Sequence, residues 1–240
     1  MIAKEELNIL WSLEQTAEKY EDRVAVSDVN QELTWKGLVK KAQVIGAELS
    51  KKVQPGNPIP VLLEKSSETL AVMLGIVYAG CFYVPVNPMN PAERLRKIME
   101  KLEPEVIISD EKGKEQLAAV GIGLEEKVIG PETLLPTTGT DLSEEQRSKL
   151  EQIQGQWKET DALYGIFTSG STGTPKAIVV SHGAASRFIR HFTEIFEITS
   201  ADVIGNQAPF DFDVSVKDIY PALKTAVSYT HLTLPTTPYV

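Results

Sequence analysis

One short segment of the chain concentrates the residue types that bind phosphate groups. The segment TSGSTGTPK, residues 168–176, holds five hydroxyl side chains, two glycines and a single lysine, directly after an apolar run. Glycine has no Cβ and tolerates positive φ, so backbone N–H groups around Gly170 and Gly173 can converge on an anion. The hydroxyls add donors, and Lys176 adds a point charge suited to phosphate. The segment therefore predicts a loop that wraps a polyphosphate.

The spacing within this segment differs from that of the P-loop of nucleotide-binding proteins. In the P-loop, G-x-x-x-x-G-K-[ST], the lysine directly follows the second glycine and a helix begins after the loop. Here Pro175 precedes Lys176, and the apolar run at 177–180 favours a strand instead. Composition alone leaves a solvent-exposed surface loop without a ligand as an open alternative.

The elements around this segment alternate between strand and helix. The runs at 162–167 and 177–180 are typical of strands, and a helix is expected to begin near His182. Similar alternation along the rest of the chain predicts an α/β fold with helices on both faces of a sheet. Ligands of such sheets bind beyond the carboxyl ends of the strands, which is where residues 168–176 would lie.

One apolar run has nearly the length of a membrane span. Residues 70–86 carry no charge, but Gly80 and Pro85 interrupt them. We interpret the run as a buried helix over 67–79, ended by Gly80 and followed by a short strand. Further helices are expected after caps at Thr34, at Asn90 with Pro91 in the first helical position, and at Ser143.

Composition excludes several classes of protein. The 240 residues carry a formal net charge of −9, which argues against nucleic acid or an anionic membrane surface as a partner. The single cysteine, Cys81, excludes an internal disulfide and a cysteine-based zinc site. The first twenty residues alternate charged and apolar groups, unlike a signal peptide. We expect a cytoplasmic enzyme whose anionic substrate is held by a local site.

Four stretches, in order along the chain, together resemble one family. The loop YGIFTSGSTGTPKAIVVSH resembles the signature of the adenylate-forming superfamily, which includes acyl-CoA synthetases, luciferases and the adenylation domains of nonribosomal peptide synthetases. LTWKGLVKKA, GIVYAGCFYVPVNPMNPAERLRKIM and PFDFDVSVKDIYPAL are similar to further motifs of that superfamily. The resemblance covers residues 5–225. It departs at Ala177, where the family usually has glycine after the lysine.

The resemblance implies a fold, a reaction and a set of binding residues. The fold would be the N-terminal portion of the adenylate-forming fold, with mixed, mostly parallel sheets flanked by helices. An amino acid carboxylate would attack the α-phosphate of ATP with Mg²⁺, and the aminoacyl group would pass from AMP to the phosphopantetheine thiol of a carrier protein. D-alanine–carrier protein ligases are close in pattern. The implied ATP residues are Thr168, Ser169, Gly170, Ser171, Thr172, Gly173 and Lys176, with Thr168 and Lys176 also catalytic.

The choice of substrate rests on Asp213. It matches the aspartate that receives the substrate's α-ammonium group in amino-acid-activating members, and Phe212 would form an aromatic wall beside the acyl group. A buried carboxylate needs a cation to offset its desolvation, and an amino acid supplies one. The alternative is that Asp213 caps the helix that follows it. Two other functions remain open: an acyl-CoA synthetase for a carboxylate without an amine, and a non-catalytic fragment that binds nucleotide or amino acid.

No catalytic role is predicted for the histidines, and the C-terminal segment lies outside these motifs. His182 is expected to begin a helix and His191 to be exposed, and neither has an acid–base partner nearby in the sequence. We expect residues 1–225 to form a partial adenylation domain, about half the family's usual length and inactive by itself. Residues 226–240 are expected to be a disordered or foreign tail, since their periodicity is weak.

Overall fold

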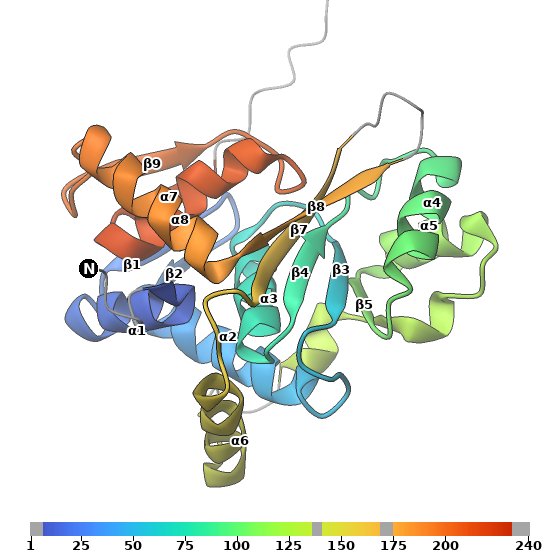
Figure 1. Cartoon of the computed structure of the whole chain (residues 1–240), viewed down its shortest axis with the longest axis horizontal. Coiled ribbons are helices and arrows are strands. Elements are labelled where there is room, and N and C mark those ends of the chain that lie inside the picture. The colour runs from blue at the N-terminus through green and yellow to red at the C-terminus, as the bar shows by residue number, and fades with distance from the viewer. Residues whose placement is uncertain (1–6, 136–140, 169–174, 232–240) are drawn as a thin grey trace, which may run out of the picture.

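The chain folds into two sheets flanked by helices (Figure 1). The computed structural model describes residues 7–135, 141–168 and 175–231. The larger sheet has six strands in the order β6-β5-β3-β4-β7-β8, and the smaller has four in the order β2-β1-β10-β9. The strands are β1 Val24–Ser27, β2 Glu32–Thr34, β3 Pro58–Leu62, β4 Phe82–Pro85, β5 Ile107–Ser109, β6 Val128–Ile129, β7 Ala162–Thr168, β8 Lys176–Ser181, β9 Val203–Asn206 and β10 Ser228–His231.

Most neighbouring strands are parallel, as the sequence predicts for this class of fold. Only the β1–β2 and β7–β8 pairs are antiparallel among the described strands. The α-helices are α1 Ile9–Lys19, α2 Trp35–Leu49, α3 Ser67–Tyr78, α4 Ala92–Leu102, α5 Glu111–Val120, α6 Glu144–Gly155, α7 His182–Ile195 and α8 Val216–Thr225. Helices α2 and α3 pack on one side of the larger sheet, and α4 and α5 pack on the other (Figure 1).

Local capping signals set the ends of several helices. The Thr34 hydroxyl accepts a hydrogen bond from the N–H of Gly37, and Ser143 forms a capping box with Gln146. Both caps confirm the sequence-based expectation. The prediction for α4 is off by one residue, because Pro91 has extended backbone at the cap position and the helix begins at Ala92.

The apolar run at 70–86 forms the expected helix and strand. Helix α3 ends at Tyr78, Gly80 follows with φ of 77°, and β4 begins at Phe82. Every residue of α3 except Glu68 is buried. No helix within the described ranges is both long enough and apolar enough to cross a bilayer.

The expectation of a disordered tail is wrong for the part of it that the structure describes. Residues Ser228–His231 form β10, which lies between β1 and β9 in the smaller sheet and pairs with both in parallel. Tyr229 on this strand is buried. A strand within a sheet gains hydrogen bonds on both edges, and these long-range pairings cannot be read from local periodicity. Residues 232–240 lie outside the described residues.

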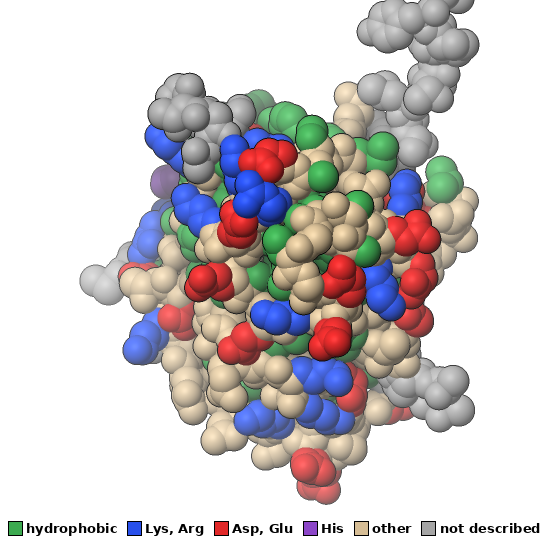
Figure 2. All heavy atoms as spheres, turned by 90° about the vertical axis from the view of Figure 1, so that its right-hand side faces the viewer, with side chains coloured by type: hydrophobic (Ala, Val, Ile, Leu, Met, Phe, Trp, Pro, Cys, Tyr) green, Lys and Arg blue, Asp and Glu red, His purple; other side chains and the backbone are tan. Residues whose placement is uncertain are grey.

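Charges are mixed on the face that carries α4 and α5. Acidic and basic side chains are interspersed there, without a large area of one sign (Figure 2). Arg96 on α4 contacts Glu93 and Glu100 on the same helix, and Lys112 on α5 contacts Glu64. Exposed pairs of this kind contribute little to stability. The negative net charge is therefore not concentrated on this face.

Close contact between α2 and α3 depends on glycine. A Cβ on Gly46 of α2 would lie 2.5 Å from the Cβ of Tyr78 and 2.9 Å from the carbonyl oxygen of Gly75, both on α3. Backbone atoms in a packed helix pair cannot move aside cheaply. The approach of the two helices therefore requires a residue without a side chain at position 46.

We expect Gly46→Ala to lower the free energy of unfolding by about 1–3 kcal/mol, because the added methyl overpacks the α2–α3 contact. Guanidinium denaturation followed by circular dichroism measures this. Gly155→Ala is the matched control, since nothing lies within 4 Å of a Cβ at that helical position. It should be neutral or slightly stabilising. Equal stability of the two variants would contradict the packing argument.

Candidate functional site

The glycine–hydroxyl segment connects two paired strands. β7 and β8 are antiparallel, with Thr168 directly opposite Lys176 and Phe167 opposite Ala177. Thr168 and Lys176 are exposed at the open end of this hairpin. The predicted strand after the loop is confirmed. The other predicted ATP residues, Ser169, Gly170, Ser171, Thr172 and Gly173, lie outside the described residues.

The open end of the hairpin lies at the carboxyl edge of the larger sheet. β3, β4 and β7 are parallel neighbours, so Leu62, Pro85 and Thr168 end them on the same side. A cavity of about 170 Å³ lies at this edge, lined by residues that follow β3 and β4 and by residues 209–211. This is the position at which ligands bind to sheets of this type.

Arg94 links this edge to the hairpin. Its Nη2 donates a hydrogen bond to the carbonyl oxygen of Phe167 at 3.4 Å, one residue before Thr168. Burial raises the pKa of Asp211, while a backbone hydrogen bond and the Arg94 guanidinium oppose that shift. Arg94 therefore contacts the hairpin and acts by its charge on Asp211. Arg94 is not among the predicted site residues, although it lies in the motif segment that ends in ERLRKIM.

A second half-buried cation joins the ends of β3 and β9. Nζ of Lys65 donates to the backbone oxygen of Asn206 at 2.9 Å and to its Oδ1 at 3.1 Å. Nδ2 of Asn206 donates in turn to Oδ2 of Asp218 at 3.0 Å, and Lys217 pairs with the other carboxylate oxygen at 2.8 Å. Burial lowers the pKa of Lys65 and the Asp218 carboxylate opposes that shift. This network fixes the two sheets to each other beside the cavity.

Asp213 lies on a one-turn 3-10 helix, Asp213–Ser215, immediately before α8. Burial, followed by the charge of Asp213, raises the pKa of Tyr164 on β7 to about 12, which places this carboxylate near the hairpin strand. Neither the 3-10 helix nor α8 has a side-chain capping hydrogen bond. The structure therefore gives no support to the alternative that Asp213 is a helix cap.

The expectation that Asp213 is buried is wrong for this structure. Asp213 is exposed, and Phe212 beside it is 57% exposed. Phe212 therefore does not form the wall of an enclosed pocket within the described residues. Asp218, five residues further along the chain, is buried, and its Oδ2 accepts a hydrogen bond from Asn206.

Three tyrosines connect the hairpin to the helix that follows Asp213. The hydroxyls of Tyr83 on β4 and Tyr220 on α8 form a buried hydrogen bond of 2.5 Å. The Tyr164 ring is stacked against both, with centroid distances of 6.0 Å and 6.4 Å. The strand that ends at Thr168 is therefore packed directly against the helix that positions Asp213.

The histidines behave as structural residues. His182 begins α7 as predicted and is 3% exposed, with its ring edge-on to Trp157 at a centroid distance of 5.6 Å. Burial lowers the pKa of His182 from 6.5 to about 4, so the ring is neutral near pH 7. His191 is exposed, with 66% of its side chain accessible, as expected.

We expect the free energy of unfolding to fall as the pH drops from about 6.5 to about 4. In this window the unfolded chain binds a proton at His182 and the folded chain does not, which amounts to about 3 kcal/mol. Urea denaturation between pH 4 and 7.5 measures the slope, and NMR titration of the His182 ring gives its pKa directly. His191→Gln, on the same helix, is the control that keeps the slope. An NMR midpoint for His182 near 6.5 would contradict the burial argument.

Comparison with curated proteins finds one family. A family model described as AMP-binding enzyme matches residues 13–233. The chain is 31% identical over 216 residues to tyrocidine synthase 1 of Brevibacillus parabrevis, which covers 90% of this chain and 19% of that protein. It is 32% identical over 222 residues to a D-alanine–D-alanyl carrier protein ligase of Bacillus velezensis, covering 91% of this chain and 41% of the ligase. The chain thus spans less than half the length of these relatives.

Solved structures show the same fold. The nonribosomal peptide synthetase FmoA3 superposes with a TM-score of 0.80 at 24% identity, covering 97% of this chain and 23% of the synthetase. VinN in complex with 3-methylaspartate superposes with a TM-score of 0.78 at 21% identity, covering 93% of this chain and 61% of VinN. These matches confirm the fold class that the sequence predicts.

Proposed function

Because the chain belongs to the AMP-binding enzyme family, we propose that it supplies the ATP-phosphate site, and part of the substrate site, of an enzyme that adenylates an amino acid. The products would be an aminoacyl adenylate and pyrophosphate. The pairing of Thr168 with Lys176 at the carboxyl edge of the larger sheet carries this proposal. It is also supported by FmoA3, a neighbour in fold that has been solved with AMPPNP bound.

The chemistry of the hairpin suits the leaving group. When a carboxylate attacks the α-phosphate of ATP, the bond to the bridging oxygen breaks and negative charge accumulates on pyrophosphate. Thr168 and Lys176 are paired across the two antiparallel strands, and an ammonium and a hydroxyl brought together in this way can bind neighbouring phosphate oxygens. Arg94 holds the adjoining carbonyl of Phe167 and so positions the hairpin.

Mg²⁺ would neutralise part of the phosphate charge. Among the described residues, no group of three or more histidine, cysteine or acidic side chains forms a metal site. Mg²⁺ commonly takes its ligands from substrate phosphates and water with only one or two carboxylates, so such a group is not required. Asp211, at the same edge as the hairpin, is one available carboxylate.

The amino acid part of the proposal rests on Asp213. The charge of its carboxylate acts on Tyr164 of β7, the strand that ends at Thr168. A substrate α-ammonium group would pair with it while the substrate carboxylate faces the nucleotide. The name of one relative, D-alanine–D-alanyl carrier protein ligase, agrees with an amino acid as the substrate and a carrier protein as the acceptor.

We expect Lys176→Gln and Thr168→Val to weaken binding of MgATP to the purified chain. Loss of a hydrogen bond to a charged group costs about 1.5–3 kcal/mol, or roughly ten- to hundredfold in affinity. Isothermal titration calorimetry measures this. Lys52→Gln is the matched control, because Lys52 is exposed and precedes β3, at the opposite edge of the sheet. Unchanged MgATP affinity in both hairpin variants would refute the phosphate site.

We expect Asp213→Asn to reduce the preference for an amino acid over the same acid without its amine. The probes are the adenosine sulfamates of alanine and of propionic acid, compared by calorimetry on the purified chain. An exposed ion pair contributes about 0.2–1 kcal/mol, so the affinity ratio should fall by about two- to fivefold, and more where the ligand excludes water. Asp22→Asn, another exposed aspartate, serves as the control. A constant ratio would favour a carboxylate substrate that lacks the amine.

We expect no amino-acid-dependent ATP–pyrophosphate exchange from the 240-residue chain alone. It spans 41% of the Bacillus velezensis ligase, and its site residues Thr168, Lys176 and Asp213 are all exposed. Water around these groups screens the charge stabilisation on which catalysis depends. Exchange above background with any amino acid would contradict this expectation and would still support the proposed reaction.

A further inference from the structure

A second cavity lies at the edge of the larger sheet opposite to the hairpin's open end. Gly56, Cys81 and Ala162 line it, and they lie at or just before the first residues of β3, β4 and β7. Its volume is about 440 Å³, within the range of roughly 300–1,000 Å³ that is typical of small-molecule sites. It shares no lining residue with the cavity at the carboxyl edge of the sheet. The proposed function therefore gives it no role.

Two ring side chains that line this cavity carry polar atoms without a partner. Nδ1 of His182 and Nε1 of Trp157 are buried, and neither forms a hydrogen bond with the described residues. Most buried polar atoms in proteins are paired, because an unpaired one has lost its hydrogen bonds to water without replacement. The two rings contact each other edge to face, with centroids 5.6 Å apart, so one small group can reach both.

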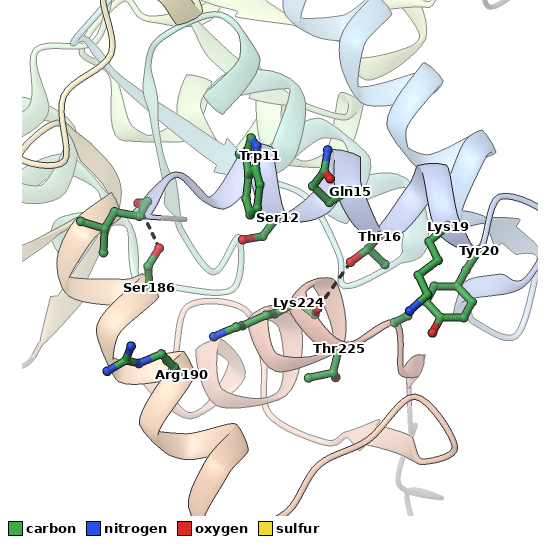
Figure 3. Close-up of a pocket in the computed structure, with 12 residues that line it drawn as sticks. Trp11, Ser12, Gln15, Thr16, Lys19, Tyr20, Ser186, Arg190, Lys224 and Thr225 are labelled. Carbon is green, nitrogen blue, oxygen red and sulfur yellow. Dashed lines mark hydrogen bonds between the residues drawn. The ribbon is translucent and has the colours of Figure 1, made fainter. Parts of the chain in front are cut away.

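The groove between α1, α7 and α8 shows how such atoms are usually satisfied (Figure 3). The hydroxyls of Thr16 and Ser186 line it, and each donates a hydrogen bond to a backbone carbonyl oxygen of another segment. In the cavity at the amino edge, the thiol of Cys81 is satisfied in the same way by the carbonyl oxygen of Gln54, at 3.2 Å. The unpaired nitrogens of Trp157 and His182 therefore stand out among the polar groups of the cavity.

Trp157 lies where its side chain can give a ligand access to these atoms. It belongs to the connection between α6 and β7 and is half-buried. Side chains in such connections change rotamer more readily than side chains within a sheet or a packed helix pair. A rotation of the indole ring opens its N–H and the adjoining face of His182 to the cavity without displacing the sheet.

The buried polar groups of the cavity are uncharged near pH 7. Burial lowers the pKa of His182 to about 4 and raises the pKa of the Cys81 thiol to about 11, so both side chains are neutral. The charged side chains that line the cavity, Lys149 and Asp161, are both exposed. A charged ligand would therefore lose its hydration without gaining a buried counter-charge. The cavity favours a ligand without net charge.

We propose that this cavity binds an uncharged small molecule that carries a carboxamide group on an apolar or aromatic body. The indole N–H of Trp157 can only donate, so it requires an acceptor such as an amide oxygen. A neutral imidazole has one donor and one acceptor nitrogen, so His182 can accept from the amide N–H of the same ligand. Leu10, Val77 and Ile153 supply apolar surface for the rest of the molecule.

Proton–nitrogen NMR of the purified chain tests the site, with benzamide as the probe and benzoate as its charged counterpart. The chain has three tryptophans, and Trp157→Phe identifies the indole N–H resonance of residue 157. We expect benzamide to shift this resonance saturably, with a dissociation constant on the order of 1 mM for so small a probe. Benzoate should bind about tenfold or more weakly. Trp35 is the internal control, because its Nε1 is also buried without a partner but does not line the cavity.

Substitutions test the contribution of each ring. We expect Trp157→Phe and His182→Phe each to weaken benzamide binding by about two- to tenfold, measured on the resonances of the probe itself. His191→Phe is the matched control, since His191 is exposed on the same helix as His182, and it should keep the affinity. Lys176→Gln should keep it as well, because Lys176 lies at the opposite edge of the sheet.

Three results would overturn the proposal. The first is a Trp157 resonance that benzamide leaves unchanged at roughly tenfold the expected dissociation constant, which would indicate that water alone occupies the cavity. The second is binding of benzoate as tight as that of benzamide. The third is full affinity for benzamide in both Trp157→Phe and His182→Phe.

Discussion

The buried hydrogen bond between Tyr83 and Tyr220 is the contact on which the arrangement of the site depends. It joins β4, at the centre of the larger sheet, to α8, the helix that follows Asp213. Removal of either hydroxyl would leave the other buried without its partner, which costs more than the net value of a hydrogen bond. Because Tyr164 is stacked against both rings, the strand ending at Thr168 shares this contact. The position of Asp213 relative to the β7–β8 hairpin is thus set from within the core.

Nearer the surface, polar contacts between side chains and backbone also hold the two sheets together. Lys65 follows β3 and binds the carbonyl oxygen of Asn206 at the end of β9, so a single ammonium spans the carboxyl ends of strands from both sheets. Partial burial of that ammonium is unfavourable, and the Asn206 and Asp218 groups offset it. Arg94 makes the equivalent connection between α4 and the hairpin. The end of β3, the end of β9 and the β7–β8 hairpin are thus each held by a hydrogen bond from a lysine or an arginine.

Local signals in the sequence were sufficient for several of the elements and for the position of the loop between two strands. The buried helix α3, its end before Gly80 and the cap at Ser143 all follow from residues close in sequence. The roles of Arg94 and Lys65 could not be predicted, because their partners lie 73 and 141 residues away. Strand β10 was missed for the same reason, since its pairing with β1 joins residues about 200 positions apart. Asp213 was expected to be buried because of the motif in which it lies. A motif gives the residue type but does not show which other segments pack over it, and those segments decide how exposed the residue is.

Solvent exposure also determines how strong the charge interactions of the predicted site residues are. Thr168, Lys176 and Asp213 face solvent, and the same part of the molecule exposes apolar groups: Ile178 is 54% accessible on the edge strand β8, and Phe212 is 57% accessible. Apolar edge strands in stable proteins are normally covered, because an open edge pairs readily with other chains. Covering this surface, by ligand or by polypeptide, would lower the local dielectric and strengthen every charge interaction at the hairpin. The groups that exclude water from this edge therefore determine how strongly the charge of Lys176 can interact with a ligand there.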